Sequence, residues 1–321
     1  MNWISRWKKI GIKVKQILKK QPTGQQEADW KNCPSCQKIS YLPDLINNSY
    51  ICECSFHFDL PPKLRLDSLF DSDYKIIEAP DNINPDPLNF EVKDGAREGY
   101  KYIEKIKKYR KITDQQTALI CASGNISGLS AVAVCFNPKF GGGRFGPAEN
   151  EHFLKAANFA VEQKVDIWVV IYQSSGIDVH TGVTGLTGMT KSIIAMNEIK
   201  KNNIPTFCVA ARATAGGTYA SSFFMHDLII IESKCVENLL FSGKRVTANI
   251  LKGTDQIPDN FGTGPGVMKS GLADITLENR KELKDTITKL ANIILKKEEL
   301  KAQEEAHENP EDFKKTASTA S

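Results

Sequence analysis

Three glycine clusters lie within residues 140–217, and they are the part of the chain best suited to chemistry. The sequence is Phe-Gly-Gly-Gly-Arg-Phe-Gly at 140–146, Ser-Ser-Gly at 174–176 and Thr-Ala-Gly-Gly at 214–217. The second and third clusters each follow a short apolar run typical of a buried strand, and each precedes a stretch suited to a helix. Glycines at such turns let backbone N–H groups come close to a ligand and point at it. The pattern predicts a pair of holes for an oxyanion or a phosphate.

Four of the eight cysteines stand close together near the N-terminus, with a spacing that suits a metal ion. Cys33 and Cys36 form a Cys-x-x-Cys knuckle, and Cys52 and Cys54 form a Cys-x-Cys pair that is one residue shorter than usual. Two such pairs supply the four thiolates of a tetrahedral zinc site. His57 is an alternative ligand for one cysteine, and a ribbon that has lost its metal is the other interpretation. We expect a closed zinc site with a structural role.

The composition is ordinary for a soluble globular protein, with 41% hydrophobic and 25% charged residues among 321. This length allows one large domain and a small appendage. The net charge of +4 is too small to predict nucleic-acid binding over the whole surface. No apolar run reaches 18 residues and no signal-like apolar region opens the chain, so we expect a cytoplasmic protein. The other four cysteines stand singly in apolar runs, as reduced core thiols do.

Residues 1–20 carry seven basic and no acidic side chains. Their apolar residues recur at helical spacing, which predicts a basic amphipathic helix. Such a helix suits a membrane surface, a nucleic acid or a partner subunit, although docking on its own protein is the simpler interpretation. A short linker at 22–26 separates this segment from the cysteines.

Strands and helices alternate from residue 117 onward, which predicts an α/β domain with its ligands at the carboxyl ends of the strands. The expected strands are 118–124, 130–136, 166–172, 205–211 and 227–232, and the first two should form a hairpin. The expected helices are 148–163, 182–202, 217–225 and 281–300. Earlier in the chain we expect helices at 61–71 and 94–111, and we expect disorder from residue 301.

The glycine motifs resemble those of the β subunit of bacterial and plastid acetyl-CoA carboxylase carboxyltransferase. The family's Phe-Met-Gly-Gly-Ser-Met-Gly corresponds to residues 140–146, and its Thr-Thr-Gly-Gly-Val-Ser-Ala-Ser corresponds to Thr-Ala-Gly-Gly-Thr-Tyr-Ala-Ser at 214–221. Its Ala-Gly-Pro-Arg-Val is Ser-Gly-Lys-Arg-Val at 242–246. The resemblance spans nearly the whole chain, to about residue 295. It implies an α/β, crotonase-like (ClpP-like) spiral fold of ββα units with a small N-terminal zinc ribbon.

The resemblance also implies a reaction and its partners. A carboxyl group would pass from carboxybiotin, held on a biotin carboxyl carrier protein, to acetyl-CoA, giving malonyl-CoA for fatty-acid synthesis. An α subunit would complete a heterotetramer. Backbone N–H groups would stabilise the enolate, so no side-chain nucleophile is needed. The expected catalytic residues are Gly176, Gly216 and Gly217. The expected substrate-binding residues are Gly142, Gly143, Ser175, Asp178 and Arg245.

Composition and the resemblance together predict five segments. They are a basic segment with its linker at 1–26, a zinc ribbon at 27–60, connector helices at 61–116, a crotonase-like carboxyltransferase domain at 117–300 and a disordered tail at 301–321.

The second glycine turn departs from the family pattern. Where the family has Ser-Gly-Gly-Ala-Arg-Met-Gln-Glu, this chain has Ser-Ser-Gly-Ile-Asp-Val-His-Thr at 174–181. Asp178 replaces an arginine, and a site built for an anion tolerates an added carboxylate poorly. The family's Thr-Asp-Pro before the last glycine pair is Ala-Arg-Ala at 211–213, so a pair of Asp178 with Arg212 is one interpretation. His180 is a candidate acid or base, or a satisfied surface histidine.

These departures leave two alternatives open. One is a diverged enzyme that decarboxylates, hydrolyses or isomerises an acyl-CoA or acyl-carrier-protein thioester without biotin. The other is a non-catalytic paralogue that binds a partner or a nucleic acid.

Overall fold

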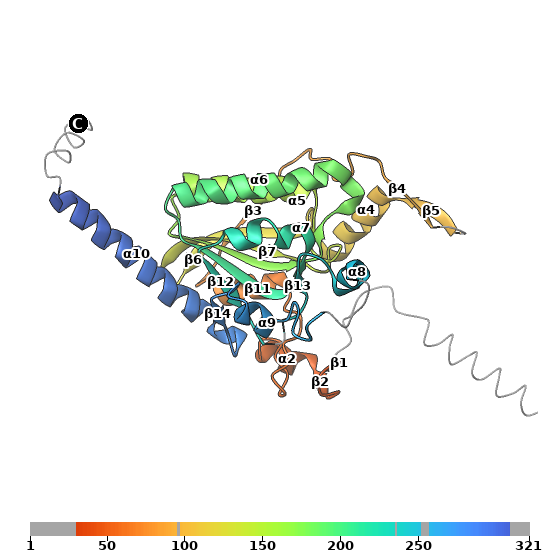
Figure 1. Cartoon of the computed structure of the whole chain (residues 1–321), viewed down its shortest axis with the longest axis horizontal. Coiled ribbons are helices and arrows are strands. Elements are labelled where there is room, and N and C mark those ends of the chain that lie inside the picture. The colour runs from red at the N-terminus through yellow and green to blue at the C-terminus, as the bar shows by residue number, and fades with distance from the viewer. Residues whose placement is uncertain (1–29, 95–96, 235, 252–256, 309–321) are drawn as a thin grey trace, which may run out of the picture. The chain divides into compact units, whose positions relative to one another are not determined.

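A computed structural model describes residues 30–94, 97–234, 236–251 and 257–308 (Figure 1). The chain divides into two compact units, Met1–Phe58 and Asp59–Ser321. The basic helix expected at 1–20, its linker and the end of the tail lie outside the described residues.

The described part of the first unit is a small hairpin and a helix. Strand β1 (Trp30–Asn32) pairs antiparallel with β2 (Ile39–Tyr41), which leads into α2 (Leu42–Asn47). The loop between the two strands is closed by hydrogen bonds from Cys33 N–H to Lys38 O at 2.8 Å and from Gln37 N–H to Cys33 O at 2.9 Å.

A second, shorter loop follows in the same unit. Cys52 N–H donates to Phe56 O and Ser55 N–H donates to Cys52 O, both at 2.8 Å. Ser55 has φ +65°, a left-handed conformation that favours glycine. The loop therefore keeps the backbone form of a metal-binding knuckle although it lacks the expected glycine.

The second unit holds an eight-stranded sheet among its described residues. The strand order is β14-β12-β11-β9-β7-β6-β3, with β13 also paired to β11. The β3–β6 and β6–β7 pairs are antiparallel, and the pairs from β7 to β14 are parallel. The sheet strands are β3 (Lys75–Ile77), β6 (Leu119–Ile126), β7 (Leu129–Phe136), β9 (Ile167–Ser174), β11 (Thr206–Ala215), β12 (Leu228–Ile231), β13 (Leu239–Leu240) and β14 (Ile275–Thr276).

Two further pairs of strands lie outside this sheet. Short strands β8 (Arg144–Phe145) and β10 (Gly176–Ile177) pair parallel, while β4 (Glu91–Asp94) and β5 (Arg97–Lys101) form an antiparallel hairpin that projects from the unit in Figure 1. The helices are α3 (Pro62–Leu69), α4 (Tyr102–Thr113), α5 (Pro147–Glu162), α6 (Gly182–Lys201), α7 (Gly216–Tyr219), α8 (Lys244–Ile250), α9 (Gly264–Lys269) and α10 (Leu283–Glu308). Three 3₁₀ turns are η1 (Val179–Thr181), η2 (Ser222–Met225) and η3 (Arg280–Glu282).

Helices cover both faces of the sheet. On one face lie α5 and α6 (Figure 1). They bury residues such as Phe153 and Met196 against Trp168 of β9. On the other face, α3 and α10 pack apolar side chains, among them Leu66 and Ile287, against alternate residues of the same strands. Strands buried on both sides explain the continuous apolar runs of the sequence.

The ββα repeat expected from the resemblance is present. A long strand of the main sheet, a short strand of the β8–β10 pair and a helix follow one another twice, as β7-β8-α5 and as β9-β10-α6. The two short strands begin within the first and second glycine clusters. This repeat therefore brings the two clusters to the same edge of the domain.

The predicted β6–β7 hairpin and the predicted α5, α6 and α10 are confirmed. Two predictions are wrong. The helix expected at 94–111 begins only at Tyr102, because Val92 pairs with Tyr100 and Asp94 pairs with Arg97 in the β4–β5 hairpin. The disorder expected from 301 is also wrong in part, because α10 continues to Glu308.

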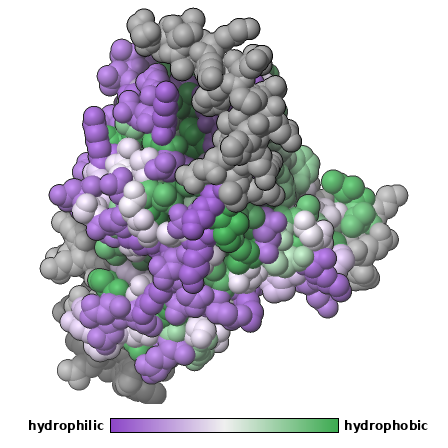
Figure 2. All heavy atoms as spheres, turned by 90° about the vertical axis from the view of Figure 1, so that its left-hand side faces the viewer, coloured by the Kyte–Doolittle hydropathy of each residue, from purple (hydrophilic) through white to green (hydrophobic). Residues whose placement is uncertain are grey.

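Within the described residues, no helix has the length and apolarity needed to cross a membrane. The face of the molecule in Figure 2 shows apolar residues as separate patches among hydrophilic ones.

Candidate active site at the glycine turns

The first two glycine clusters pack directly on each other. Gly141, Gly142 and Gly143 all have positive φ, between +60° and +75°. Ser175 N–H donates to Gly142 O at 2.8 Å. A Cβ at Gly143 would lie 1.9 Å from Gln173 O, so only glycine lets the two backbones approach so closely.

The second and third clusters also touch. Gly176 has φ +105°, and a Cβ there would lie 2.7 Å from Ala215 O. Gly216 has φ +61°, and its own Cβ would face Gly176 Cα at 3.6 Å. The three clusters, which are far apart in sequence, therefore form one continuous surface of backbone.

The buried hydroxyl of Ser174 joins the three turns. Its Oγ donates to Gly143 O at 2.7 Å and accepts from Gly176 N–H at 3.1 Å. It also lies 3.1 Å from Thr218 Oγ1, in the short helix α7 of the third turn. Sequence reasoning treated Ser174 only as part of a motif. Its position at the end of a buried strand, directly before the turn, was the available signal.

The turns differ in the donors that they offer. Helix α7 begins at Gly216, so the amides of Gly216 and Gly217 have no partner within that helix. Gly176 N–H, by contrast, is held by Ser174, so Gly176 serves close packing and is not an open donor in this structure. Among the expected substrate-binding residues, Gly142 and Ser175 are exposed, whereas Gly143 is buried.

Asp178 does not form the predicted pair with Arg212. Its Oδ2 lies 2.8 Å from Nη1 of Arg144, while Arg212 Nε lies 2.8 Å from Asp59 at the surface. The pairing of β8 with β10 places Gly176 beside Arg144, and so it brings Arg144 to Asp178. The Asp178 side chain is 2% exposed, so it is not open to direct contact with substrate as the sequence suggested.

Arg144 is the centre of a buried cluster at this edge. Its Nη2 lies 3.1 Å from Glu149 Oε2, and its Nη1 donates to the Tyr102 hydroxyl at 2.6 Å. Tyr102 in turn donates to Asp178 Oδ2 at 2.7 Å. Burial alone would lower the pKa of Arg144, but Glu149, Tyr102 and Asp178 together raise it above its usual value. Burial raises the pKa of Tyr102, and the charge of Asp178 adds to this effect.

Glu149 ties the cluster to the start of α5. Its Oε2 accepts from Gly146 N–H at 3.0 Å, and its Oε1 accepts from Ala118 N–H at 3.0 Å. This carboxylate therefore caps α5 and fixes the first strand of the domain. No motif marks Glu149 or Tyr102, and Arg144 stands inside the first glycine cluster with no sign of its partners.

His180 is held on the turn that follows Asp178. Its Nδ1 lies 2.9 Å from Asp178 Oδ1, and its ring stacks on Tyr102 at 4.0 Å between centroids, 11° from parallel. The ring of Phe90 meets it edge-on at 5.3 Å. The imidazole is 26% exposed, so it is neither fully buried nor a free surface side chain.

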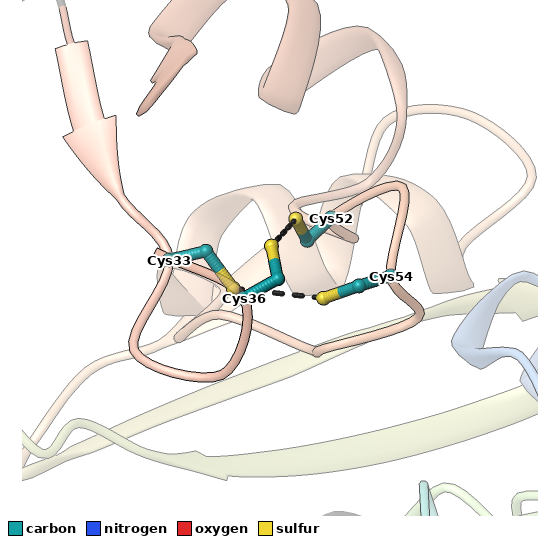
Figure 3. A group of neighbouring side chains, drawn as sticks. All are labelled: Cys33, Cys36, Cys52 and Cys54. Atoms are coloured by element: carbon teal, nitrogen blue, oxygen red, sulfur yellow. Dashed lines mark hydrogen bonds between the residues drawn. The ribbon is translucent and has the colours of Figure 1, made fainter. Parts of the chain in front are cut away.

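The four cysteines of the first unit come together (Figure 3). Their sulfur atoms all lie within 4.8 Å of one another, and Cys33–Cys54 and Cys36–Cys52 are each 3.7 Å apart. Four sulfurs at about 2.3 Å from a zinc ion would be roughly 3.8 Å apart, so this cage fits zinc. His57 is not part of the group.

Arg245 lies in α8, but its side chain is outside the described residues. A cavity of about 560 Å³ lies elsewhere in the second unit, between β3, β6 and the end of α4, and includes His152 in its wall. None of the glycine turns lines it.

Comparison with known proteins supports the resemblance seen in the sequence. Residues 102–320 match the carboxyl transferase domain family. The acetyl-coenzyme A carboxylase carboxyl transferase subunit beta of Pelagibacter ubique (strain HTCC1062) is 32% identical over 301 residues, which cover 92% of this chain and 93% of that protein. The protein of the same name from Rhizobium rhizogenes (strain K84 / ATCC BAA-868) is 28% identical over 298 residues, with the same coverage of both chains.

Solved structures show the same fold at lower identity. A transcarboxylase 12S with methylmalonyl-coenzyme A and methylmalonic acid bound has a TM-score of 0.57 and 20% identity, over 72% of this chain and 41% of that chain. A Pseudomonas malonate decarboxylase heterodimer has a TM-score of 0.54 and 16% identity, over 78% of this chain and 90% of that chain. These likenesses confirm a crotonase-like α/β fold. With the family match over most of its length, the chain belongs to the carboxyl transferase family.

Proposed function

We propose that the chain is the β subunit of a biotin-dependent carboxyltransferase that makes malonyl-CoA from acetyl-CoA. The observation that carries this proposal is the meeting of three glycine turns around the Ser174 hydroxyl. A surface built from backbone, with helix-start amides at its edge, suits a reaction that develops charge on oxygen and needs no side-chain nucleophile.

The enolate of the thioester is the species that this surface would stabilise. Its negative charge develops on the thioester oxygen when a proton leaves the α-carbon. The amides of Gly216 and Gly217 stand at the start of α7, where the helix has no partner for them. A well-placed donor of this kind contributes about 3 kcal/mol to the transition state. We assign the enolate oxygen to these two amides.

The carboxyl group would come from carboxybiotin, presented as a second substrate by a separate carrier protein. When that group leaves, negative charge remains on the biotin ureido oxygen and needs donors of its own. Gly142 and Ser175 are the exposed residues of the neighbouring turns. Because their amides already donate to Pro138 O and Gly142 O, the Ser175 hydroxyl is the donor that these two residues offer. We propose that biotin lies against them.

We also propose that an α subunit docks on helix α6. Val183, Leu186 and Ile194 lie three, eight and eleven residues apart, which places them on one face of this helix, and they are 76%, 56% and 57% exposed. An apolar stripe of this kind marks an interaction surface. We propose that the heterotetramer meets its carrier protein in the cytoplasm.

Zinc would have a structural role. It would bind Cys33, Cys36, Cys52 and Cys54 in a closed tetrahedral site with no open position for a substrate. Metal analysis of the purified chain should give about one zinc per chain. Replacing Cys36 and Cys54 by Ser together should lower this to below about 0.1, while the Cys121→Ser variant, changed at a buried core thiol, should keep it.

The function is tested with two matched glycine variants in the complex that co-purifies with the chain. Gly216→Ala and Gly271→Ala both place a side chain at positive φ, +61° and +70°, and neither new Cβ meets an atom closer than 3.6 Å. Their costs in stability should therefore be similar. Malonyl-CoA formation should fall about 10²-fold in Gly216→Ala only, because the donor amides shift. Equal rates of malonyl-CoA formation in the two variants would overturn the proposal. So would a purified complex that has neither an α subunit nor carboxyl-transfer activity.

A further inference from the structure

Asp178 and His180 form a pair with the geometry of a proton-transfer dyad. A carboxylate can only accept, so the hydrogen of their 2.9 Å contact lies on Nδ1 of His180. His180 N–H also donates to the same Oδ1 at 3.1 Å. The carboxylate thus fixes the tautomer of the ring and its direction. Nε2 is left as the basic nitrogen, and no hydrogen bond to it exists among the described residues.

The carboxylate of this dyad is itself held rigidly. Oδ1 is used by His180, and Oδ2 is used by Arg144 at 2.8 Å and by the Tyr102 hydroxyl at 2.7 Å. Arg144 stands where the family signature has serine, and Asp178 stands where the family has arginine. The two residues that depart from the signature are therefore ion-pair partners on neighbouring turns. One of them is the buried carboxylate that orients His180.

The ring is also fixed by aromatic neighbours and remains accessible. Tyr102 covers one face at 4.0 Å, and Phe90 meets it edge-on. The next residue on the turn, Val179, is 81% exposed, so this turn lies at an open surface. Asp178 follows Gly176 by two residues, about 7 Å along an extended strand. The dyad therefore stands directly beside the glycine turns.

We propose that His180 is a general base and acid for the thioester substrate bound at these turns. This inference rests on the proposed acyl-CoA site. Nε2 takes a proton from the α-carbon of the acetyl thioester, and the electron pair of that C–H bond moves onto the thioester oxygen. The α-carbon then bonds to the carboxyl carbon as the bond from that carbon to the biotin nitrogen breaks. The Nε2 proton goes to this nitrogen, so atoms and charge balance.

A base that belongs to the protein acts even when biotin is absent. The test is therefore the exchange of the α-hydrogens of acetyl-CoA with D₂O, followed by mass spectrometry, with the co-purified complex and no biotin. We expect wild-type exchange above the buffer rate. His180→Asn keeps an amide donor for Asp178 but has no base, and its exchange should fall about 10²-fold. Added imidazole should restore part of it, which a purely structural role would not allow.

Val179→Ala is the control on the same turn. The Val179 side chain is apolar and 81% exposed, so it does not hydrogen-bond to Asp178 or His180, and the exchange of this variant should stay within about twofold of wild type. The proposal is overturned if wild type shows no exchange without biotin, or if His180→Asn exchanges at the wild-type rate. Carboxyl transfer is measured in parallel. Normal carboxyl transfer with no hydrogen exchange would reject the role of His180 as a base but not the proposed function. Hydrogen exchange without any biotin-dependent transfer would reject the proposed function but not the role of His180.

Discussion

Two buried ion clusters of the second unit have opposite charge balance. At the glycine turns, the single guanidinium of Arg144 faces the carboxylates of Asp178 and Glu149. On the other side of the sheet, the single carboxylate of Glu232 faces Arg65 of α3 and, at 3.4 Å, Arg280 of η3. All these side chains are at most 4% exposed. One cluster has a carboxylate in excess, and the other has a guanidinium in excess.

The difference shows which cluster can take part in chemistry. A carboxylate can bind a proton, whereas an arginine does not lose one in proteins. The excess negative charge at the turns also has a partly exposed histidine, His180, beside it. The cluster around Glu232 has fixed charges and joins α3 and η3 to the end of β12. We therefore expect the first cluster to serve function and the second to serve stability.

Removing Glu232 should have the largest effect on stability. Glu232→Gln removes the buried carboxylate that both guanidinium groups face, and these groups keep their charge. The free energy of unfolding should fall by about 5 kcal/mol, measured by urea denaturation. Glu237→Gln, a change of an exposed glutamate nearby, should alter it by less than about 0.5 kcal/mol. Equal effects of the two changes would contradict a structural role for the cluster.

Removing Arg144 should cost less, and the cost should depend on pH. Arg144→Gln leaves two carboxylates buried, and the loss should be about 3 kcal/mol near pH 8. As the pH falls, the folded variant binds a proton that the unfolded chain does not, so its deficit relative to wild type should shrink toward pH 5. Glu232→Gln should show no such recovery. Urea denaturation of both variants at pH 5 and pH 8 measures these losses of unfolding free energy. If the losses of the two variants changed with pH in the same way, the proposed difference between the clusters would be wrong.

The sequence was sufficient for the fold but not for these clusters. Apolar runs and glycine turns predicted most of the parallel strands and their helices, because burial on both faces and tight turns are local properties of the chain. Glu232 and Arg65 are 167 positions apart, and nothing local to either residue indicates the other. Charged residues of this kind find partners only through the packing of the sheet.

The candidate site shows the same limit. His180 was identified from its place after the second turn, and the glycines were identified from their clusters. The partner of Asp178 was predicted wrongly, because it depends on the register of two-residue strands β8 and β10, which carry no periodic signal. The place of Ser174 before the second turn was visible in the sequence, but the role of its hydroxyl could not be assigned, since that role exists only once three separate turns have met.

Removing one of the two like charges from each cluster should change the free energy of unfolding by a smaller amount. Glu149→Gln weakens charge-assisted hydrogen bonds to Arg144 and to two backbone amides, so we expect a loss of about 2 kcal/mol. Burial lowers the pKa of Arg280 to about 10, although Glu232 opposes this, so its charge is poorly stabilised in the folded state. Arg280→Met should therefore change stability by only about 1 kcal/mol. Thermal or urea unfolding of the two variants checks that Glu149→Gln is the more destabilising change. A larger loss of unfolding free energy in Arg280→Met would contradict this prediction.

The smallest effect is expected for the surface ion pair of Arg212, the arginine that one interpretation of the sequence had paired with Asp178. Arg212 and Asp59 are 42% and 55% exposed, so water already solvates both charges and salt screens their attraction. Arg212→Ala should lower the free energy of unfolding by less than about 1 kcal/mol, and the loss should shrink further in 0.5 M salt. The buried pair of Arg144 and Asp178 is shielded from salt, so the deficit of Arg144→Gln should hardly change in the same buffer. A strong salt effect on Arg144→Gln would show that water reaches this cluster, and the assignment of a rigid, oriented carboxylate to Asp178 would then fail.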